Sequence, residues 1–191
     1  MSDGSVLISC RPLEAADWEF VRRIYAEGIA TRNATFETEV PTEEVLNDKW
    51  LAGHRWVAVA GDGVAGWAAM TATSPRECYR GVVETSVYVS ADFRGRGVGK
   101  ALVQQQASAA DAADLWTLQT SIFPENLASL AGVGNLRTFP APTSFFGDDF
   151  APSDLSEGDD KWVRAVALPA NAHQAGMFAE YPDCRSLGLL V

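Results

Sequence analysis

The sequence predicts a mixed α/β domain with an antiparallel meander in its middle. The candidate elements follow one another in the order βα, α, β, β, β, α, β, α. Three strand candidates come in a row with no helix between them, as an antiparallel meander requires. A length of 191 residues, 47% of them hydrophobic, is enough for one globular domain with a tail.

The first part of the chain predicts one strand and two helices. The strand covers residues 6–11 and ends at Pro12, which has no N–H to donate to a sheet. A helix is expected over residues 17–29, where hydrophobic residues recur at helical spacing. After a short extended piece at 35–39, Thr42 and two acidic residues indicate the start of a second helix that should reach about Ala52.

The middle of the chain predicts most of the sheet. Strands at 55–60 and 64–73 flank Gly61-Asp62-Gly63, whose Asp-Gly pair favours a hairpin turn. A polar loop leads to a strand at 82–90 with valines on one face. The remaining elements are a helix at 97–113, a strand at 115–122 and a helix that opens at residues 124–126.

The character of the sequence changes near Gly132. Residues 132–191 contain five of the nine prolines and an acidic stretch, with no sustained periodicity. Residues 161–168 are the best strand candidate there. We therefore expect a core domain over residues 1–131 and an atypical C-terminal segment over 132–191, which either completes the sheet or is partly irregular.

Composition and charge argue against several classes of function. The 25 acidic and 15 basic residues give a formal charge of −10, whereas nucleic-acid binders usually carry a basic face. No run approaches the roughly 20 hydrophobic residues that span a membrane, and residues 1–5 lack a signal pattern. The three cysteines form neither a zinc nor a disulfide pattern. We expect a protein of the reducing cytoplasm with no metal, nucleic-acid or membrane partner.

The segment from Arg94 to Lys100 carries the most chemical information. A strand leads into alternating glycines at 95, 97 and 99, and these lead into a helix. Glycines allow positive φ and a close approach of backbone N–H groups to an anion, and the helix N-terminus adds unpaired N–H donors. Three basic residues, Arg94, Arg96 and Lys100, supply charge in an otherwise acidic chain. This pattern predicts a diphosphate-binding loop.

Three nucleotide sites compete for this loop. A P-loop needs a glycine where Arg94 stands and a hydroxyl residue where Ala101 stands. A dinucleotide fold needs Gly-x-Gly-x-x-Gly, and the glycine spacing here differs. The coenzyme A pattern, [Arg/Gln]-x-x-Gly-x-[Gly/Ala] at a helix start, is matched by Arg94, Gly97 and Gly99.

With these residues the sequence resembles the GNAT superfamily of N-acetyltransferases, and more narrowly the phosphinothricin and methionine sulfoximine acetyltransferase group. The resemblance spans roughly residues 6–131. It rests on residues 8–12, 35–39, 79–81, 83–89, the glycine loop and 122–126. It implies the GNAT fold, with a mixed, mostly antiparallel central sheet flanked by helices.

The resemblance also implies roles for particular residues. Glu84 would be the general base for the acceptor amine, although a structural carboxylate paired with an arginine is the competing interpretation. Residues expected to bind acetyl-CoA are Val87, Tyr88, Val89, Arg94, Gly95, Arg96, Gly97, Val98, Gly99, Lys100 and Asn126. Residues expected to line the acceptor site are Phe36, Glu37, Glu77, Cys78, Tyr79 and Arg80. For Asn126, a plain helix N-cap is the alternative.

The function implied is acetyl transfer from acetyl-CoA to the amine of a small amino acid or analogue, such as phosphinothricin or methionine sulfoximine. Two alternatives stay open: a catalytically impaired module that binds coenzyme A, and a GNAT enzyme that acts on a protein N-terminus or a polyamine. A homodimer is implied by the resemblance alone. After Ala131 the family's general acid and closing strands are not visible, so residues 132–191 are either a native ending or an altered reading frame.

Overall fold

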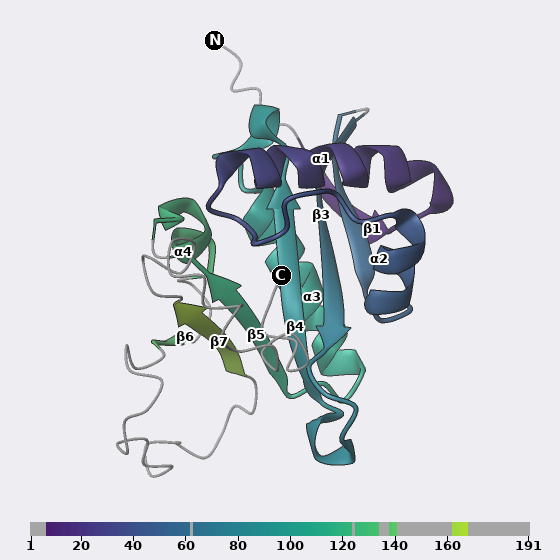
Figure 1. Ribbon diagram of the computed structural model, residues 1–191, viewed down its shortest axis with the longest axis vertical. Coiled ribbons are helices and arrows are strands. Elements are labelled where there is room, and N and C mark those ends of the chain that lie inside the picture. The colour runs from purple at the N-terminus through teal and green to yellow at the C-terminus, as the bar shows by residue number, and fades with distance from the viewer. Residues whose placement is uncertain (1–6, 62, 124, 134–137, 141–161, 168–191) are drawn as a thin grey trace.

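The computed structural model describes residues 7–61, 63–123, 125–133, 138–140 and 162–167, and these form one mixed sheet with helices on both faces (Figure 1). The strand order is β1-β2-β3-β4-β5-β7-β6. The strands are β1 (Ile8–Pro12), β2 (Arg55–Ala60), β3 (Gly63–Ala72), β4 (Val82–Val89), β5 (Thr117–Ile122), β6 (Thr138–Pro140) and β7 (Trp162–Ala167). The predicted mixed central sheet flanked by helices is confirmed.

The predicted meander is also confirmed. Strands β1 to β4 pair antiparallel with their neighbours, whereas β4 and β5, β5 and β7, and β6 and β7 pair in parallel. At the hairpin between β2 and β3, Ala60 pairs with Gly63 and Gly61 has a φ of +63°. A glycine suits this turn because other residues rarely adopt positive φ.

Helices α1 (Trp18–Thr31) and α2 (Glu43–Lys49) cover one face of the sheet, and α3 (Val98–Ala112) covers the other; α4 (Leu127–Val133) follows β5 (Figure 1). Three short 3-10 turns complete the described elements, namely η1 (Ala15–Asp17), η2 (Glu77–Tyr79) and η3 (Ala91–Phe93). Among the described residues, no helix is long and hydrophobic enough to cross a bilayer.

The alternation of side chains along the strands divides the core into two clusters. Under α3, small and branched residues such as Ala68, Val83 and Leu102 pack together. Under α1 and α2, aromatic rings dominate: Trp67 stacks on Tyr88 with ring centroids 4.5 Å apart. Burial on both faces fixes the register of β4, because a shift of one residue would exchange its two faces.

Two expected elements differ from the structure. The second helix ends at Lys49 and not near Ala52, because Trp50 leaves the helical conformation and the Leu51 N–H donates to the carbonyl oxygen of Met70 at 2.8 Å. Residues 35–39 form no strand and bend at 36, 38 and 39. Here the Glu37 N–H donates to the Thr35 hydroxyl at 3.1 Å, a local bond that competes with strand pairing.

The C-terminal predictions are met only in part. Strand β7 at Trp162–Ala167 confirms the strand expected at 161–168, and α4 ends at Val133, next to the predicted break. Residue 6 of the first expected strand and most of residues 132–191 lie outside the described residues. A native ending and an altered reading frame therefore both stay open for residues 132–191.

Candidate active site

The candidate site lies where β4 and β5 part. Their parallel pairing covers only Val82–Glu84 against residues 117–119, while β4 stays paired with β3 as far as Val89. In the part of the chain that the structure describes, the edge of β4 that faces away from β3 therefore has no β5 partner from Thr85 onward. Apart from the Val89 carbonyl oxygen, which accepts from the Arg94 Nε, the backbone N–H and C=O groups of this edge are available to a ligand.

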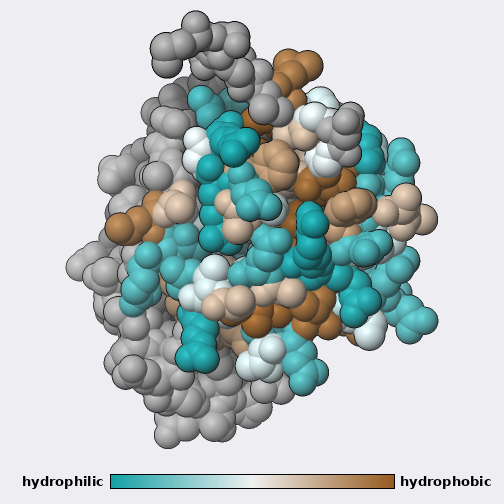
Figure 2. Space-filling model, turned by 90° about the horizontal axis from the view of Figure 1, so that it is seen from above, coloured by the Kyte–Doolittle hydropathy of each residue, from teal (hydrophilic) through white to brown (hydrophobic). Residues whose placement is uncertain are grey.

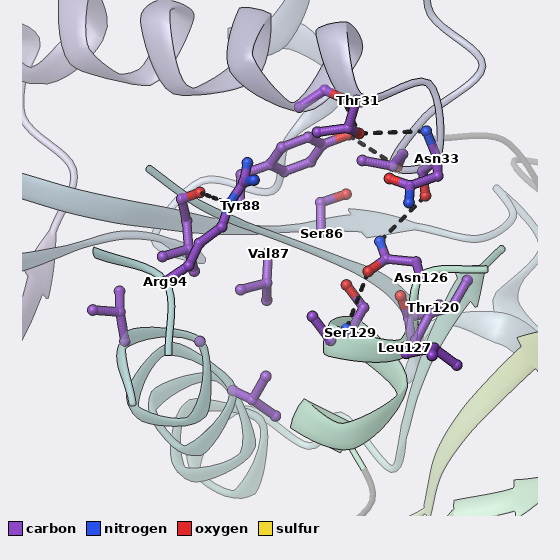
Figure 3. A pocket seen from close by; sticks show the side chains of 18 of the residues that line it. Thr31, Asn33, Ser86, Val87, Tyr88, Arg94, Thr120, Asn126, Leu127 and Ser129 are labelled. Atoms are coloured by element: carbon purple, nitrogen blue, oxygen red, sulfur yellow. Dashed lines mark hydrogen bonds between the residues drawn. The ribbon is translucent and has the colours of Figure 1, made fainter. Parts of the chain in front are cut away.

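A cavity of about 790 Å³ fills this opening, which is within the usual range of about 300–1,000 Å³ for small-molecule sites. Figure 3 shows Val87, Arg94, Asn126 and Ser129 around it, from β4, the glycine loop and α4. The cavity is lined by backbone and side chains of β4 residues 85–89, of the glycine loop, of β5 and of the start of α4.

The glycine loop has the backbone that an anion cradle needs. Gly95 and Gly97 have φ values of +72° and +86°, and Gly97 is the N-cap of α3. The first N–H groups of α3 have no partner within the helix, so they and the helix dipole favour a negative ligand at this point. Gly99 differs: an added Cβ would meet the Val89 side chain at 3.6 Å, an ordinary contact.

The three basic residues of the loop are placed differently. Arg94 and Lys100 line the cavity, and the Arg94 Nε donates to the Val89 carbonyl oxygen at 3.5 Å. The Arg96 guanidinium carbon lies 5.5 Å from the centre of the Phe93 ring, and Arg96 is outside the cavity lining. The structure thus brings together every predicted acetyl-CoA residue except Arg96.

Glu84 is buried, with 4% of its surface exposed, on the face of β4 that α1 and α2 cover. Burial raises its pKa to about 7, while the charge of Lys49 and a hydrogen bond from the Ser121 hydroxyl at 3.5 Å act in the opposite direction. Among the described residues, no basic group lies within 4.0 Å of the carboxylate. The structural arginine partner of the competing interpretation is therefore not found there.

Lys49 and Ser121 are additions that the sequence did not predict. Lys49 is the last residue of α2. Two residues later the Leu51 N–H donates to the Met70 carbonyl oxygen of β3. The next residue of β3, Thr71, pairs with Glu84. Burial lowers the pKa of Lys49, and the carboxylates of Glu37 and Glu84 oppose this. A lysine in the last turn of a helix usually interacts with the helix dipole, and a serine in a strand usually belongs to a polar face. The sequence pattern therefore did not indicate that either residue lies at the site.

The predicted acceptor residues separate into two places. Phe36 packs against Phe123, a cavity-lining residue, with ring centroids 4.7 Å apart, and Glu37 is exposed beside it. Residues Glu77 to Arg80 form the exposed turn η2 and its end, outside the cavity lining. There Arg80 pairs with Glu77 at 3.6 Å and lies 5.1 Å from the centre of the Trp116 ring.

Asn126 lines the cavity, and its amide is bonded to the protein (Figure 3). Its Oδ1 accepts from the Ser129 N–H at 3.1 Å, which is an N-cap bond for α4. Its Nδ2 donates to the Asn33 carbonyl oxygen at 3.2 Å and so joins α4 to the loop after α1. The N-cap interpretation of Asn126 is therefore correct, and a ligand contact stays a prediction.

Comparison with known proteins agrees with this geometry. The family model described as "Acetyltransferase (GNAT) family" matches residues 18–131. The chain is 34% identical over 129 residues to YwnH of Bacillus subtilis, whose name assigns it provisionally as a phosphinothricin acetyltransferase; the match covers 64% of this chain and 78% of YwnH. It is 32% identical over 130 residues to the L-methionine sulfoximine/L-methionine sulfone acetyltransferase of Pseudomonas aeruginosa, covering 64% of this chain and 74% of that protein.

A solved structure of similar fold contains the cofactor. The phosphinothricin acetyltransferase of Sinorhizobium meliloti in complex with acetyl-CoA superposes with a TM-score of 0.61 at 28% identity, covering 68% of this chain and 74% of that one. The fold, the open edge of β4 and the glycine loop thus define an acyltransferase of the coenzyme A type. The chain belongs to the acetyltransferase (GNAT) family and is an acetyl-CoA-dependent N-acetyltransferase.

Proposed function

We propose that this enzyme acetylates the amine of a small amino acid or amino-acid analogue of the phosphinothricin or methionine sulfoximine type, with Glu84 as the general base. The observation that carries the proposal is the position of Glu84, a buried carboxylate on β4 beside the point where β4 and β5 part. The acceptor class is supported by relatives that carry these substrates in their names at 32–34% identity.

The cavity suits acetyl-CoA, which supplies an activated thioester acetyl group. The loop N–H groups, Arg94 and Lys100 would hold the diphosphate. The free edge of β4 at Val87–Val89 would pair with the pantetheine arm as an added strand would. One of these N–H groups would polarise the thioester carbonyl. Tyr88 adds no charge there, since burial raises the pKa of its hydroxyl well above the usual value.

Glu84 would accept the proton that the attacking amine must lose. An amine is mostly protonated at neutral pH, so a base with a pKa near the working pH is the most effective partner. With a pKa raised to about 7, Glu84 is available in both forms at that pH. Its hydrogen bond with Ser121, which lines the cavity, connects the carboxylate to the site.

The test is the Glu84→Gln variant, assayed with saturating acetyl-CoA against phosphinothricin, methionine sulfoximine, a polyamine and a peptide N-terminus. We expect kcat to fall by roughly 10²–10⁴-fold with the preferred acceptor, while the affinity for coenzyme A is unchanged. The matched control is Glu44→Gln, on the exposed first turn of α2, which should behave as wild type.

Each result distinguishes between the candidate functions. Turnover with the two amino-acid analogues alone supports the proposal. A preference for the polyamine or the peptide contradicts the acceptor class, and near-normal turnover of Glu84→Gln removes this residue from the mechanism. Binding of coenzyme A by the wild type without turnover on any amine indicates the impaired module.

A further inference from the structure

A carboxylate of α1 holds the beginning of the glycine loop. The Glu27 Oε2 accepts from the Ala91 backbone N–H at 2.7 Å, and the Glu27 Oε1 lies 3.5 Å from the Ser90 hydroxyl, which donates to it. Residues 27 and 91 are 64 positions apart in the sequence. Ala91 is the first residue of η3, the turn that leads directly into Arg94 and Gly95.

The Glu27 carboxylate replaces the side-chain cap that η3 lacks at its N-terminus. The first N–H group of a helical turn has no partner within the turn, and Ser90, the N-cap of η3, makes no side-chain cap bond to it. Glu27 therefore supplies from α1 the acceptor that Ser90 does not. The Ser90 N–H itself donates to the Ala65 carbonyl oxygen of β3 at 2.9 Å, so two consecutive backbone N–H groups fix the start of the turn to β3 and to α1.

The position of Glu27 has little freedom. The next residue, Gly28, lies so close to β4 that an added Cβ would meet the Tyr88 ring at 2.5 Å. Helix α1 is therefore packed directly on β4 at this point, and the Glu27 side chain is carried to the turn by that packing. Seen from above, the surface mixes hydrophilic and hydrophobic residues (Figure 2). The Glu27 side chain is 28% exposed.

The charge of Glu27 would by itself weaken a site for a diphosphate. A carboxylate near an anion is repulsive, and the nearest described cation, Arg23, lies 3.9 Å away as an i,i+4 partner on the surface, where such pairs contribute little. A hydrogen-bonding role in the loop accounts for an acidic residue at this place.

We infer that Glu27 is a positioning residue for acetyl-CoA: it fixes the turn from which the diphosphate loop starts. The inference rests on the proposed binding of the diphosphate by this loop. Glu27 acts through Ala91 and Ser90, so its loss should affect the part of the cofactor that the loop holds, and not the acceptor or the thioester.

The experiment compares Glu27→Ala, Glu27→Gln and the control Glu19→Ala, an exposed glutamate in the first turn of α1. Each is assayed with acetyl-CoA and with S-acetylpantetheine, which has the same thioester but no diphosphate. For Glu27→Ala we expect KM for acetyl-CoA to rise roughly 3- to 10-fold, the size expected for one lost hydrogen bond. Its kcat, its KM for the amine and its kcat/KM with S-acetylpantetheine should stay at the wild-type values.

Glu27→Gln separates the bond from the charge. Its amide oxygen can still accept from Ala91 while the repulsive charge is gone, so KM for acetyl-CoA should equal or fall below the wild-type value. The dissociation constant of coenzyme A, measured by calorimetry, should follow the same order. This variant keeps the hydrogen bond, so a KM for acetyl-CoA above the wild-type value in Glu27→Gln would contradict the inference even where Glu27→Ala does not fold.

Three results would overturn the inference. An unchanged KM of Glu27→Ala for acetyl-CoA removes the role, and equal losses with acetyl-CoA and S-acetylpantetheine indicate a general structural effect. A Glu27→Gln variant as impaired as Glu27→Ala excludes the hydrogen bond as the cause. A wild-type enzyme with no affinity for coenzyme A would instead contradict the proposed function itself.

Discussion

At the scale of single residues, environment decides the chemistry of the acidic groups. Asp17 and Glu84 are both buried carboxylates, yet their pKa values move in opposite directions. The guanidinium of Arg11 donates to the two carboxylate oxygens of Asp17 at 2.7 and 2.8 Å and lowers the pKa of Asp17. The Glu14 N–H donates to the same carboxylate and lowers its pKa further. Glu84 has one long hydrogen bond and, among the described residues, no cation within 4.0 Å, so burial outweighs the more distant charge of Lys49. The first group suits stability and the second suits proton transfer.

The pH dependence of catalysis should report Glu84. Because the base must be ionised, kcat/KM should rise with pH through about 7. In Lys49→Met the cation that lowers the pKa of Glu84 is lost, so this rise should move to higher pH, while Lys49→Arg should keep it near the wild-type position. Initial rates over a pH series would measure this. A profile that is identical in wild type and Lys49→Met would show that Lys49 does not act on Glu84.

Asp17 should contribute a pH-dependent part of the stability. Its folded pKa is lowered, so the contribution is present above the unfolded pKa of about 3.9 and is lost as the pH falls through the folded pKa. Asp17→Asn should lower the free energy of unfolding at pH 7 by about 1–3 kcal/mol. Urea unfolding at pH 7 and at acidic pH would measure it. A difference that persists undiminished in acid would contradict the ion pair as its source.

At the scale of elements, the loop between β4 and α3 combines two kinds of glycine. Gly97 needs its positive φ of +86°, whereas Gly99 is helical and has room for a methyl group. Other glycines serve packing: a Cβ at Gly81 would meet the Trp116 ring at 2.2 Å. The repeated Gly-x-Gly pattern therefore does not have one cause, and the two positions should respond differently to substitution.

Substitution of Gly97 should weaken cofactor binding through the backbone. Gly97→Ala forces a side chain into left-handed conformation at a cost of about 1–2 kcal/mol, and a rearranged loop would lose N–H donors to the diphosphate. We expect KM for acetyl-CoA to rise about tenfold or more. Gly99→Ala is the matched control and should leave KM near its wild-type value. Equal KM values for the two variants would contradict the assignment of the loop conformation to Gly97.

At the scale of the whole molecule, the cleft depends on contacts between distant parts of the chain. Gln106 of α3 is fully buried: its Oε1 accepts from the Thr85 hydroxyl of β4, and its Nε2 donates to the Ala69 carbonyl oxygen of β3 at 3.1 Å. This tether fixes α3 on the sheet below the cavity. On the other side, Asn126 joins α4 to Asn33 after α1. Acetyl-CoA in the cavity would contact both sides and should therefore stabilise the whole fold.

Ligand-induced stabilisation gives a test that needs no acceptor. A ligand at about 100 times its dissociation constant adds about 2.7 kcal/mol to the free energy of unfolding, which corresponds to roughly 5–10 °C in Tm for a domain of this size. Acetyl-CoA should produce such a shift, and acetate should not. The absence of a shift at saturating acetyl-CoA would contradict binding in this cavity.

A comparison with and without acetyl-CoA also tests the predicted homodimer. Size-exclusion chromatography with light scattering, with and without acetyl-CoA, would measure the mass of the species against 20.5 kDa for one chain. A mass of twice this value is expected from the resemblance, and a single-chain mass at all concentrations would contradict it.

The sequence by itself determined the order of elements, the meander and the glycine loop, and the resemblance that it carries predicted Glu84 as the general base. These features have local causes: periodicity sets strands and helices, and a positive φ favours glycine at positions 61, 95 and 97. The two-residue period of one strand also placed Glu84 on the face opposite Val83, Val87 and Val89 of β4.

Only the tertiary structure decided which side chains meet. Three interactions connect residues far apart in the chain: the charge of Lys49 acts on Glu84, Glu27 accepts from the Ala91 N–H, and Asn126 donates to the Asn33 carbonyl oxygen. No local pattern of the sequence encodes such pairs. It also showed that Arg96 lies on Phe93 and that residues 77–80 form an exposed turn outside the cavity. The physical reason is that side-chain contacts and pKa values depend on burial and packing, which exist only when the whole chain is folded.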